Sequence, residues 1–242
     1  MRSRGIRFEK VFNFRDLGGY QTSDGRTTRW GRLFRADDLS RLCAPDHETF
    51  RALGIRTVVD LRRPDEVEQD GRCPDLGGVT YHHVHFVHPK WAPQTQATNE
   101  ERVAFLLDRY AEMSKHGAEC IGQTLRLIAD SDRAPLVFHC IAGKDRTGII
   151  AALTLSLLGV PDHVVAEDYA ASEDAEPHAW AYFSQFKPDL PKRWMTFTIS
   201  PPEAMLGFLG YLRREHGSIE KYVESVGVTA DHLEAMRAHL LD

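Results

Sequence analysis

The sequence of 242 residues has no run of about 20 apolar residues, the length needed to cross a bilayer. Residues 1–10 carry charge with no apolar core after them, so a classical signal peptide is not expected. The formal net charge of −5 argues against general nucleic-acid binding, which needs an excess of positive charge. These absences predict a globular protein with no integral membrane segment and no nucleic-acid partner.

Cysteine is scarce, and its four copies form no CxxC pair. A disulfide framework is therefore not expected, and free thiols favour a reducing, cytoplasmic compartment. Four histidines lie close together, at His82, His83, His85 and His88. On a strand they would divide between two faces, and no cysteine or acidic triad completes a metal site by spacing. We expect neither a metal ion nor another cofactor.

The remaining sequence alternates between β-like and helix-like segments. Strands are expected at residues 32–35, 57–61, 80–87 and 136–138. Helices are expected at residues 45–53, 64–69, 99–115, 118–130, 149–158 and 161–171, and again within 203–241. The region 184–202 is rich in proline and is expected to form a loop or cover. This order predicts an α/β fold with helices on both faces of a central sheet.

The stretch 137–148 is the most informative part of the chain. Cys140 follows a short apolar strand, and Arg146 stands six residues later, just before a long apolar helix. Backbone N–H groups at a helix N-terminus, together with a guanidinium, form a natural site for a phosphate group. Gly143 allows the tight bend that such a loop needs. The loop is not a Walker A motif, because its lysine is followed by Asp145 rather than Ser or Thr.

A second match to the same Cys-x5-Arg spacing runs from Cys120 to Arg126. Around it, Ile121, Leu125 and Ile128 recur at helical spacing. This predicts a partly buried cysteine inside an amphipathic helix, where no loop can surround an anion.

Each residue from Cys140 to Thr147, apart from Asp145, has an expected role in binding or attacking a phosphate group. Cys140 is the expected nucleophile, because a helix N-terminus and cationic neighbours favour the reactive thiolate. Arg146 is expected to bind two phosphoryl oxygens bidentately. The Thr147 hydroxyl is expected to donate to the cysteine sulfur, or to cap the helix. Lys144 would add charge for a substrate with more than one phosphate, or would remain a solvated loop lysine. The loop residues Ile141, Ala142 and Gly143 complete the expected substrate-binding set.

Two carboxylates compete for the role of general acid. Asp145 lies in the loop itself, whereas Asp60 ends a strand that is expected to neighbour the strand before the nucleophile. Residues 91–93 lack the aspartate of a Trp-Pro-Asp loop. We favour Asp145 as the acid and Asp60 as an orienting carboxylate, with Asp60 as a structural partner of Arg146 left open. His139 is expected to fix the loop by hydrogen bonding rather than to shuttle protons.

The segment 139–148, His-Cys-x-x-Gly-Lys-Asp-Arg-Thr-Gly, resembles the active-site loop of bacterial protein tyrosine phosphatases of the kind secreted by mycobacteria. Weaker similarities to the same family occur at residues 13–19, 35–40, 59–62 and 217–222. They extend from about residue 11 to the end of the chain. The resemblance therefore implies a single phosphatase domain, 11–242, preceded by a tail at 1–10.

The resemblance also implies the cysteine-phosphatase fold, with extra helices forming a lid over the pocket. The aromatic residues that would line such a lid, or an ordinary core, are Trp180, Phe183, Phe186, Trp194 and Phe197. Members of the family are metal-free and act on phosphotyrosine; some also act on phosphoserine and phosphothreonine, and some on phosphoinositides. The family's link between Lys144-Asp145 and inositol-lipid activity makes phosphoinositide hydrolysis the alternative function. Some relatives leave the cell without a classical leader, so the cytoplasm is only the default location.

Two other classes remain less favoured. A phosphate-binding pseudophosphatase would bind without turnover, yet every group that catalysis needs is present in the loop. A sulfurtransferase or arsenate reductase would need a sulfur donor or a resolving cysteine, and no cysteine spacing nominates one. The expected partner is thus a phosphorylated protein or a phosphoinositide, and the sequence does not indicate an oligomeric state.

Overall fold

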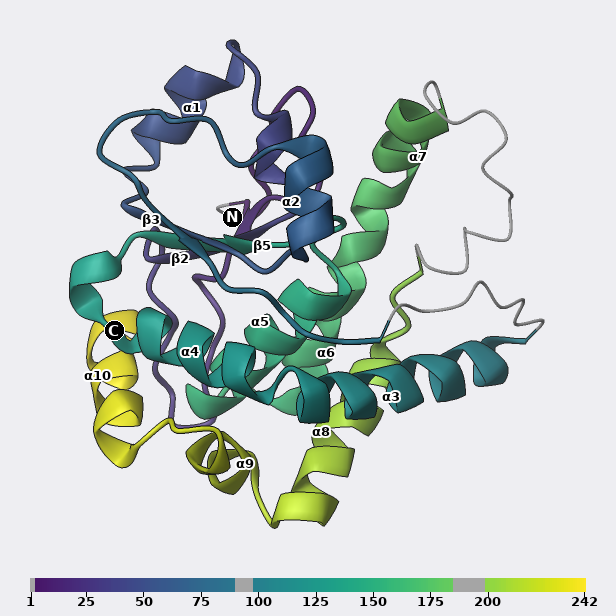
Figure 1. Cartoon of the computed structure of the whole chain (residues 1–242). Helices are drawn as coiled ribbons and strands as arrows, with labels where there is room; N and C mark the ends of the chain where they lie inside the picture. The colour runs from purple at the N-terminus through teal and green to yellow at the C-terminus, as the bar shows by residue number, and fades with distance from the viewer. Residues whose placement is uncertain (1–2, 90–97, 185–198) are drawn as a thin grey trace.

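The computed structural model describes residues 3–89, 98–184 and 199–242. Its centre is a five-stranded sheet in the order β1-β2-β5-β3-β4 (Figure 1). The strands are β1 (Arg15–Asp16), β2 (Leu33–Ala36), β3 (Thr57–Asp60), β4 (Thr80–His83) and β5 (Leu136–His139). Strand β1 is antiparallel to β2, and the other pairs are parallel. The carboxyl end of β5 therefore lies between those of β2 and β3.

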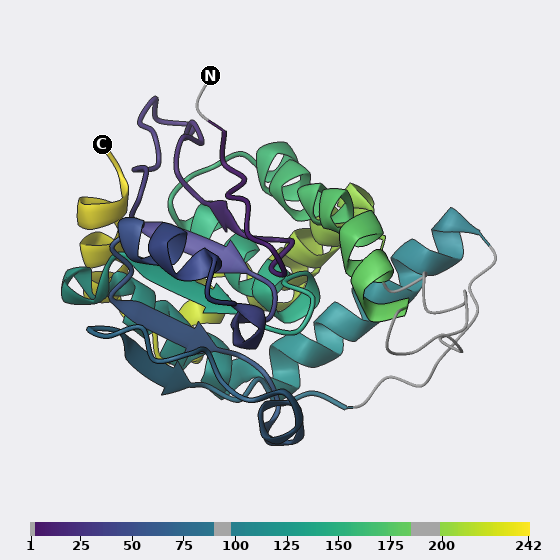
Figure 2. The ribbon, with the colours of Figure 1, turned by 90° about the horizontal axis from the view of Figure 1, so that it is seen from above.

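Helices cover both faces of this sheet, as the alternating sequence pattern predicts (Figures 1 and 2). One face carries α1 (Asp46–Ala52) and α2 (Pro64–Asp70). The other carries α3 (Asn99–His116), α4 (Ala118–Ala129), α5 (Asp145–Leu157), α6 (Asp162–Ala170), α8 (Pro202–His216), α9 (Ile219–Ser225) and α10 (Ala230–Leu240). Short 3-10 helices occur at Leu39–Arg41, Ser131–Arg133 and Ala171–Ala175, and the last of these leads into α7 (Glu176–Ser184).

The two faces bury separate cores because successive strand residues point in opposite directions. Val58 and Val137 belong to the core beneath α1, whereas Val59 and Phe138 pack into the larger core on the other face. Helix α5 is buried along almost its whole length, as expected from its apolar composition. It therefore forms a fixed support directly behind the loop of residues 140–144, called the phosphate loop below.

Two differences from the sequence-based expectations concern the periphery. Strand β4 ends at His83 rather than near Val87. Helix α7 was not expected, because a proline and a weak apolar pattern obscure it. Near the start of the chain, residues 4–6 lie alongside β1, with the Asp16 N–H donating to the Arg4 carbonyl at 3.0 Å.

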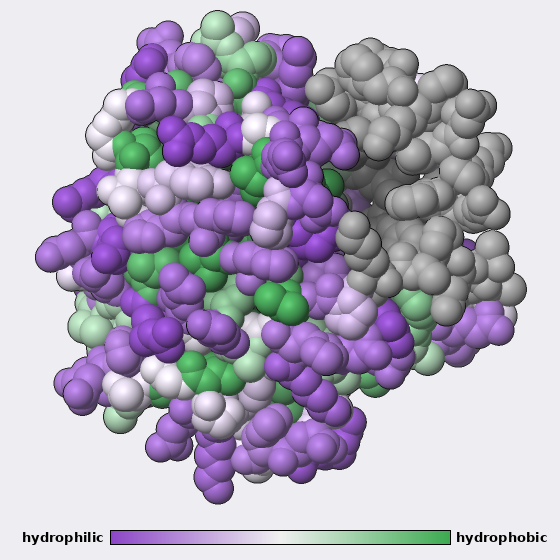
Figure 3. Space-filling model, viewed as in Figure 1, coloured by the Kyte–Doolittle hydropathy of each residue, from purple (hydrophilic) through white to green (hydrophobic). Residues whose placement is uncertain are grey.

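The proposed lid is largely outside the described residues. This applies to Phe186, Trp194 and Phe197 and to the side chain of Phe183. Trp180 lies on α7 and is partly exposed. Within the ranges described, no helix is both long and apolar enough to cross a bilayer. The described surface visible in Figure 3 is mostly hydrophilic, with small separate apolar patches.

Candidate active site

The phosphate loop occupies residues 140–144, between the end of β5 and the start of α5. Cys140 is only 2% exposed, and Arg146 lies in the first turn of the buried helix. The loop thus lies at the carboxyl edge of the parallel strands, where ligands bind in open α/β sheets. The second Cys-x5-Arg match has a different setting, because Cys120 is buried within α4, as expected.

The carbonyl groups of residues 141–143 are all bound from outside the loop. The Asp38 N–H donates to the first at 3.2 Å, Asn13 Nδ2 to the second at 2.9 Å, and Arg35 Nη2 to the third at 2.7 Å. In the described part of the chain, no acceptor meets the N–H groups of these three residues. The N–H that points opposite to a bound carbonyl is that of the next residue. Binding the first two carbonyls from outside therefore turns the N–H groups of Ala142 and Gly143 inward, as donors for an anion.

Gly143 is required at this bend for two reasons. Its φ of +64° is a left-handed conformation that favours glycine. A Cβ atom there would also lie 2.5 Å from the Ala36 carbonyl oxygen, which belongs to the backbone of β2. The loop can therefore lie against the end of β2 only without a side chain at position 143.

A buried ion-pair network lies behind the loop. The Arg35 guanidinium that binds the Gly143 carbonyl also pairs with Asp168 on α6, and Arg15 Nε pairs with the same carboxylate at 2.9 Å. The charged Arg15 and Arg35 hold the pKa of Asp168 below its usual range, although burial opposes this. Sequence reasoning did not single out Arg35 or Asp168, because the partners lie more than 130 residues apart in the chain.

Glu66 of α2 is the partner of Arg146. Its two carboxylate oxygens lie 2.6 Å and 3.1 Å from the guanidinium nitrogens. Burial disfavours the Arg146 charge, but the nearby Cys140 sulfur and Glu66 raise the pKa of Arg146 above its usual range. Glu66, and not Asp60, is thus the structural partner of the loop arginine. The sequence offered only a weak signal, since an acidic residue in the first turn of a helix commonly serves as a cap.

Asp60 is completely buried at the end of β3. It accepts hydrogen bonds from Arg62 at 2.7 Å and from the Tyr81 hydroxyl at 2.9 Å. Burial raises its pKa, but His139 and Arg62 outweigh that effect and lower it. Arg62 also pairs with Asp38 at 2.9 Å, and the Asp38 N–H binds the loop. Asp60 is therefore connected to the loop through other side chains.

His139 lies directly beneath the loop and is fully buried. Its Nδ1 is 3.4 Å from the Cys140 carbonyl oxygen, and its Nε2 is 3.6 Å from Asp60. Burial lowers the pKa of His139 despite the neighbouring carboxylate. These contacts suit a residue that fixes the loop.

Asp145 begins α5 and keeps some exposure. Its Oδ1 accepts a hydrogen bond from the Tyr110 hydroxyl at 2.6 Å. The Lys144 ammonium lies 3.4 Å from the same oxygen and donates to the Ile199 carbonyl at 2.9 Å. The Lys144 side chain is only 3% exposed, so its charge is directed at protein groups in this structure.

Thr147 is buried one residue after the arginine. Lys144, rather than Thr147, occupies the N-cap position of α5. Among the residues described, the Thr147 hydroxyl has no hydrogen-bond partner, neither the Cys140 sulfur nor a backbone group.

The histidines do not gather into a metal site. His82 contacts Arg133 at 3.0 Å, and His83 Nε2 lies 2.8 Å from the Arg62 carbonyl oxygen. Across residues 3–89, 98–184 and 199–242, no group of three or more His, Cys, Asp or Glu side chains could bind a metal ion.

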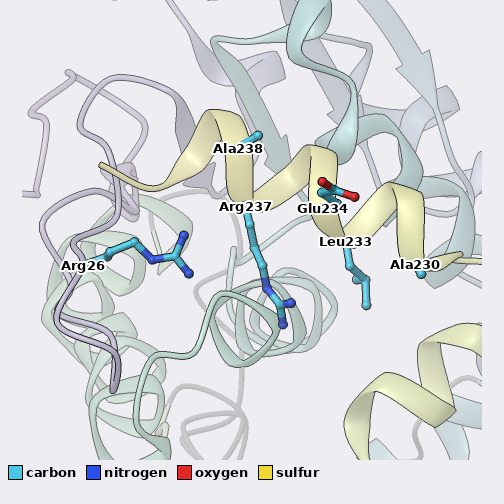
Figure 4. A pocket seen from close by; sticks show the side chains of 6 residues that line it. All are labelled: Arg26, Ala230, Leu233, Glu234, Arg237 and Ala238. Carbon is cyan, nitrogen blue, oxygen red and sulfur yellow. The ribbon is translucent and has the colours of Figure 1, made fainter.

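A cleft of about 500 Å³ lies along α10, lined by Arg26, Ala230, Leu233, Glu234, Arg237 and Ala238 (Figure 4). Both arginines are already engaged, Arg26 with Asp24 and Arg237 with the Leu157 carbonyl. Helix α10 packs on α4 and on the turn before β5, so this cleft lies near the amino end of β5. It is separate from the phosphate loop at the carboxyl end.

Comparisons with known proteins agree with this geometry. A family model described as the tyrosine phosphatase family matches residues 6–242. The chain is 29% identical over 275 aligned residues to the triple specificity protein phosphatase PtpB of Mycobacterium tuberculosis, with 96% of this chain and 97% of the relative covered. It is 29% identical over 224 residues to the tyrosine-protein phosphatase of Nostoc commune, covering 85% and 73% of the two chains. The protein therefore belongs to the tyrosine phosphatase family.

Proposed function

We propose that this protein hydrolyses phosphotyrosine esters through a phosphocysteine intermediate. The observation that carries the proposal is the loop after β5, whose three successive carbonyls are bound from behind while Cys140 and Arg146 border the same small space. Such a row of backbone donors beside a guanidinium suits a phosphoryl group. A thiol in that position suits nucleophilic attack on phosphorus.

In the first step, the Cys140 thiolate attacks phosphorus and forms an S–P bond. The P–O bond to the tyrosyl group breaks, and its electron pair leaves on the phenolic oxygen, which takes a proton from Asp145. Arg146 and the N–H groups of residues 141–143 bind the three phosphoryl oxygens throughout. Phosphoryl transfer depends mainly on positioning and on stabilising charge at these oxygens.

In the second step, a water molecule attacks the phosphocysteine while Asp145 accepts one of its protons. The S–P bond breaks, inorganic phosphate forms, and Cys140 returns as a thiolate. The Thr147 hydroxyl, which is buried and has no partner in the described residues, can then donate to the departing sulfur. Asp60 keeps its orienting role by binding Arg62.

Phosphotyrosine is preferred over phosphoinositide because of the lysine geometry. A lipid with several phosphates needs a free second cation, whereas the Lys144 ammonium binds Ile199 and Asp145. In this proposal the N–H of Lys144 still contributes to the loop. The relative PtpB is named for triple specificity, so phosphoserine and phosphoinositide are tested as alternative substrates.

The decisive experiment follows phosphate release from a phosphotyrosine peptide, a phosphoserine peptide and phosphoinositide vesicles, with and without a chelator. We expect the first to be hydrolysed fastest, with no effect of the chelator. Rapid quenching with a ³²P-labelled substrate should trap the label on Cys140, and Cys140→Ser should abolish turnover while keeping ester binding. Label on another residue, or an absolute requirement for a divalent ion, would exclude the mechanism; binding without release would indicate a pseudophosphatase.

A further inference from the structure

We infer that Tyr110 is a positioning residue that, with Tyr169 behind it, fixes the Asp145 carboxyl for proton transfer; this inference rests on the proposed role of Asp145. Tyr110 comes from α3 and Tyr169 from α6, so two helices distant in sequence converge on the first residue of α5. The Tyr110 hydroxyl lies 2.6 Å from Asp145 Oδ1 and 2.6 Å from the Tyr169 hydroxyl. The two tyrosine hydroxyls and the Asp145 carboxyl thus form one short hydrogen-bonded chain behind the phosphate loop.

The two oxygens of the Asp145 carboxyl differ in their contacts. The Tyr110 hydroxyl and the Lys144 ammonium both contact Oδ1, at 2.6 Å and 3.4 Å. In the described portion of the protein, Oδ2 has no partner. A carboxylic acid that donates its proton from one oxygen can still accept a hydrogen bond on the other. The arrangement therefore holds Oδ1 in place and leaves Oδ2 as the oxygen that gives and takes the proton.

The direction of the hydrogen bonds follows from the chemistry of the groups. An ionised carboxylate only accepts, so Tyr110 must donate to Asp145, and its oxygen then accepts the proton of Tyr169. Burial, reinforced by the Asp145 charge, raises the pKa of both tyrosines well above the usual range. Both hydroxyls therefore stay protonated, and the chain keeps its direction while Asp145 changes its protonation state.

The packing around the tyrosines limits their movement. Their rings meet edge to face, with centroids 6.1 Å apart at 86°. Gly148 of α5 brings the helix backbone close to the second ring, because a Cβ atom there would lie 3.1 Å from Tyr169 Cδ2. Buried hydroxyl groups are costly unless they are hydrogen-bonded, so two phenylalanines would suit a purely apolar contact better. The presence of tyrosine rather than phenylalanine at both positions is explained by the hydrogen bonding that leads to the Asp145 carboxyl.

The test is Tyr110→Phe, which removes one hydroxyl and keeps the ring. We expect kcat for an aryl phosphate with a poor leaving group, such as phenyl phosphate, to fall about tenfold to hundredfold, the factor that one hydrogen bond to a charged group supplies. An activated ester such as 4-nitrophenyl phosphate should lose less than about threefold in kcat, since its leaving group hardly needs a proton. KM should change little for both substrates. Tyr110→Phe added to Asp145→Asn should cause no further selective loss, because the group that Tyr110 positions is already gone.

A matched control is Tyr222→Phe. Its hydroxyl is also buried and donates to the Ser114 carbonyl at 2.8 Å, away from Asp145. It should leave the ratio of the two kcat values unchanged. Tyr169→Phe removes only the outer bond of the chain and should give a smaller selective loss, so it serves if Tyr110→Phe does not fold.

The outcomes separate the inference from the proposed function. Equal slowing of both substrates by Tyr110→Phe, or a further selective loss in the double variant, would overturn the role of Tyr110 alone. If Asp145→Asn itself slows both substrates equally, the acid is another group, and both assignments fail. Loss of the phosphocysteine would instead refute the proposed mechanism as a whole.

Discussion

Glu66 offers the most direct test of how the site keeps its arginine in place. Glu66→Gln preserves the size of the side chain and one acceptor oxygen, but removes the negative charge that faces Arg146. The carboxylate makes two charge-assisted contacts with Arg146, at 2.6 Å and 3.1 Å, and a third with Arg63 at 3.1 Å. The change therefore leaves a buried guanidinium only partly satisfied and free to take other orientations.

The size of the loss in stability follows from how exposed the two paired side chains are. The Arg146 and Glu66 side chains are 9% and 14% exposed, closer to a buried pair than to a surface one. Breaking a buried pair costs about 3–5 kcal/mol, and an exposed pair contributes at most about 1 kcal/mol. Glutamine restores about 1 kcal/mol through one neutral hydrogen bond. We expect the free energy of unfolding at pH 7 to fall by about 2–4 kcal/mol. We expect kcat/KM to fall about tenfold to hundredfold because Arg146 loses its orientation.

The pair also predicts a pH dependence. Burial raises the Glu66 pKa, but the hydrogen bonds and charge of Arg146 outweigh this and lower it below its usual range. A carboxyl group with a lowered pKa in the folded state stabilises the protein fully above its ordinary pKa, and loses that contribution as the pH falls. The difference in stability between the two proteins should therefore be complete at pH 7 and shrink below about pH 4.5.

Urea unfolding between pH 3 and pH 7, together with steady-state kinetics at pH 7, measures both effects. The control is Asp65→Asn, which removes a neighbouring charge that is 52% exposed and pairs with Arg63 rather than Arg146. It should change stability by less than about 0.5 kcal/mol and leave kcat/KM unaltered. If Glu66→Gln behaves like Asp65→Asn in both assays, the pair does not position the arginine and the reasoning is refuted.

Three further predictions concern the loop and its surroundings. Gly143→Ala should destabilise the protein in thermal unfolding by more than the control Gly77→Ala does, and should abolish most activity. Both glycines have a positive φ, near +64° and +78°, but only a Cβ at position 143 would clash with backbone atoms. The control should therefore show only the strain of the backbone conformation, about 1–2 kcal/mol. Asp60→Asn should lower the free energy of unfolding in urea by about 3–5 kcal/mol while leaving the leaving-group dependence of kcat unchanged, whereas a selective loss would make it the acid. Iodoacetamide at pH 7 should spare Cys73 and Cys120 in the native protein when modified peptides are mapped, because burial raises the pKa of each thiol to about 12; rapid labelling would contradict this.

The sequence predicted the parts of the site that are local in the chain. The strand, loop and helix around Cys140 follow one another within a dozen residues, and their order alone specifies a helix N-terminus beside a thiol. Asp60 was expected to approach the nucleophile because it ends a neighbouring strand, and β3 does pair with β5. The same reasoning separated Cys120 from the site through its helical spacing.

Contacts between residues that lie far apart in the sequence could not be predicted in this way. Glu66 meets Arg146 across 80 residues, and Arg35 meets Asp168 across 133. Nothing in the local pattern of a short acidic helix distinguishes a cap from a partner for a distant arginine. Tyr110 likewise fits an ordinary amphipathic helix until the structure brings its hydroxyl to Asp145.

The buried charges around the loop are better explained by the anion site than by stability. Replacing buried ion pairs with apolar groups of similar size is often neutral or stabilising, so Arg35 with Asp168, and Arg62 with Asp60, are not favourable merely as core elements. Each arginine instead connects to a carbonyl of the loop, Arg35 directly and Arg62 through Asp38. Because they fix these carbonyls before any ligand arrives, little reorganisation of the donors remains for the transition state. The charges thus hold the glycine-containing loop in the one geometry that the proposed binding of a phosphoryl group requires.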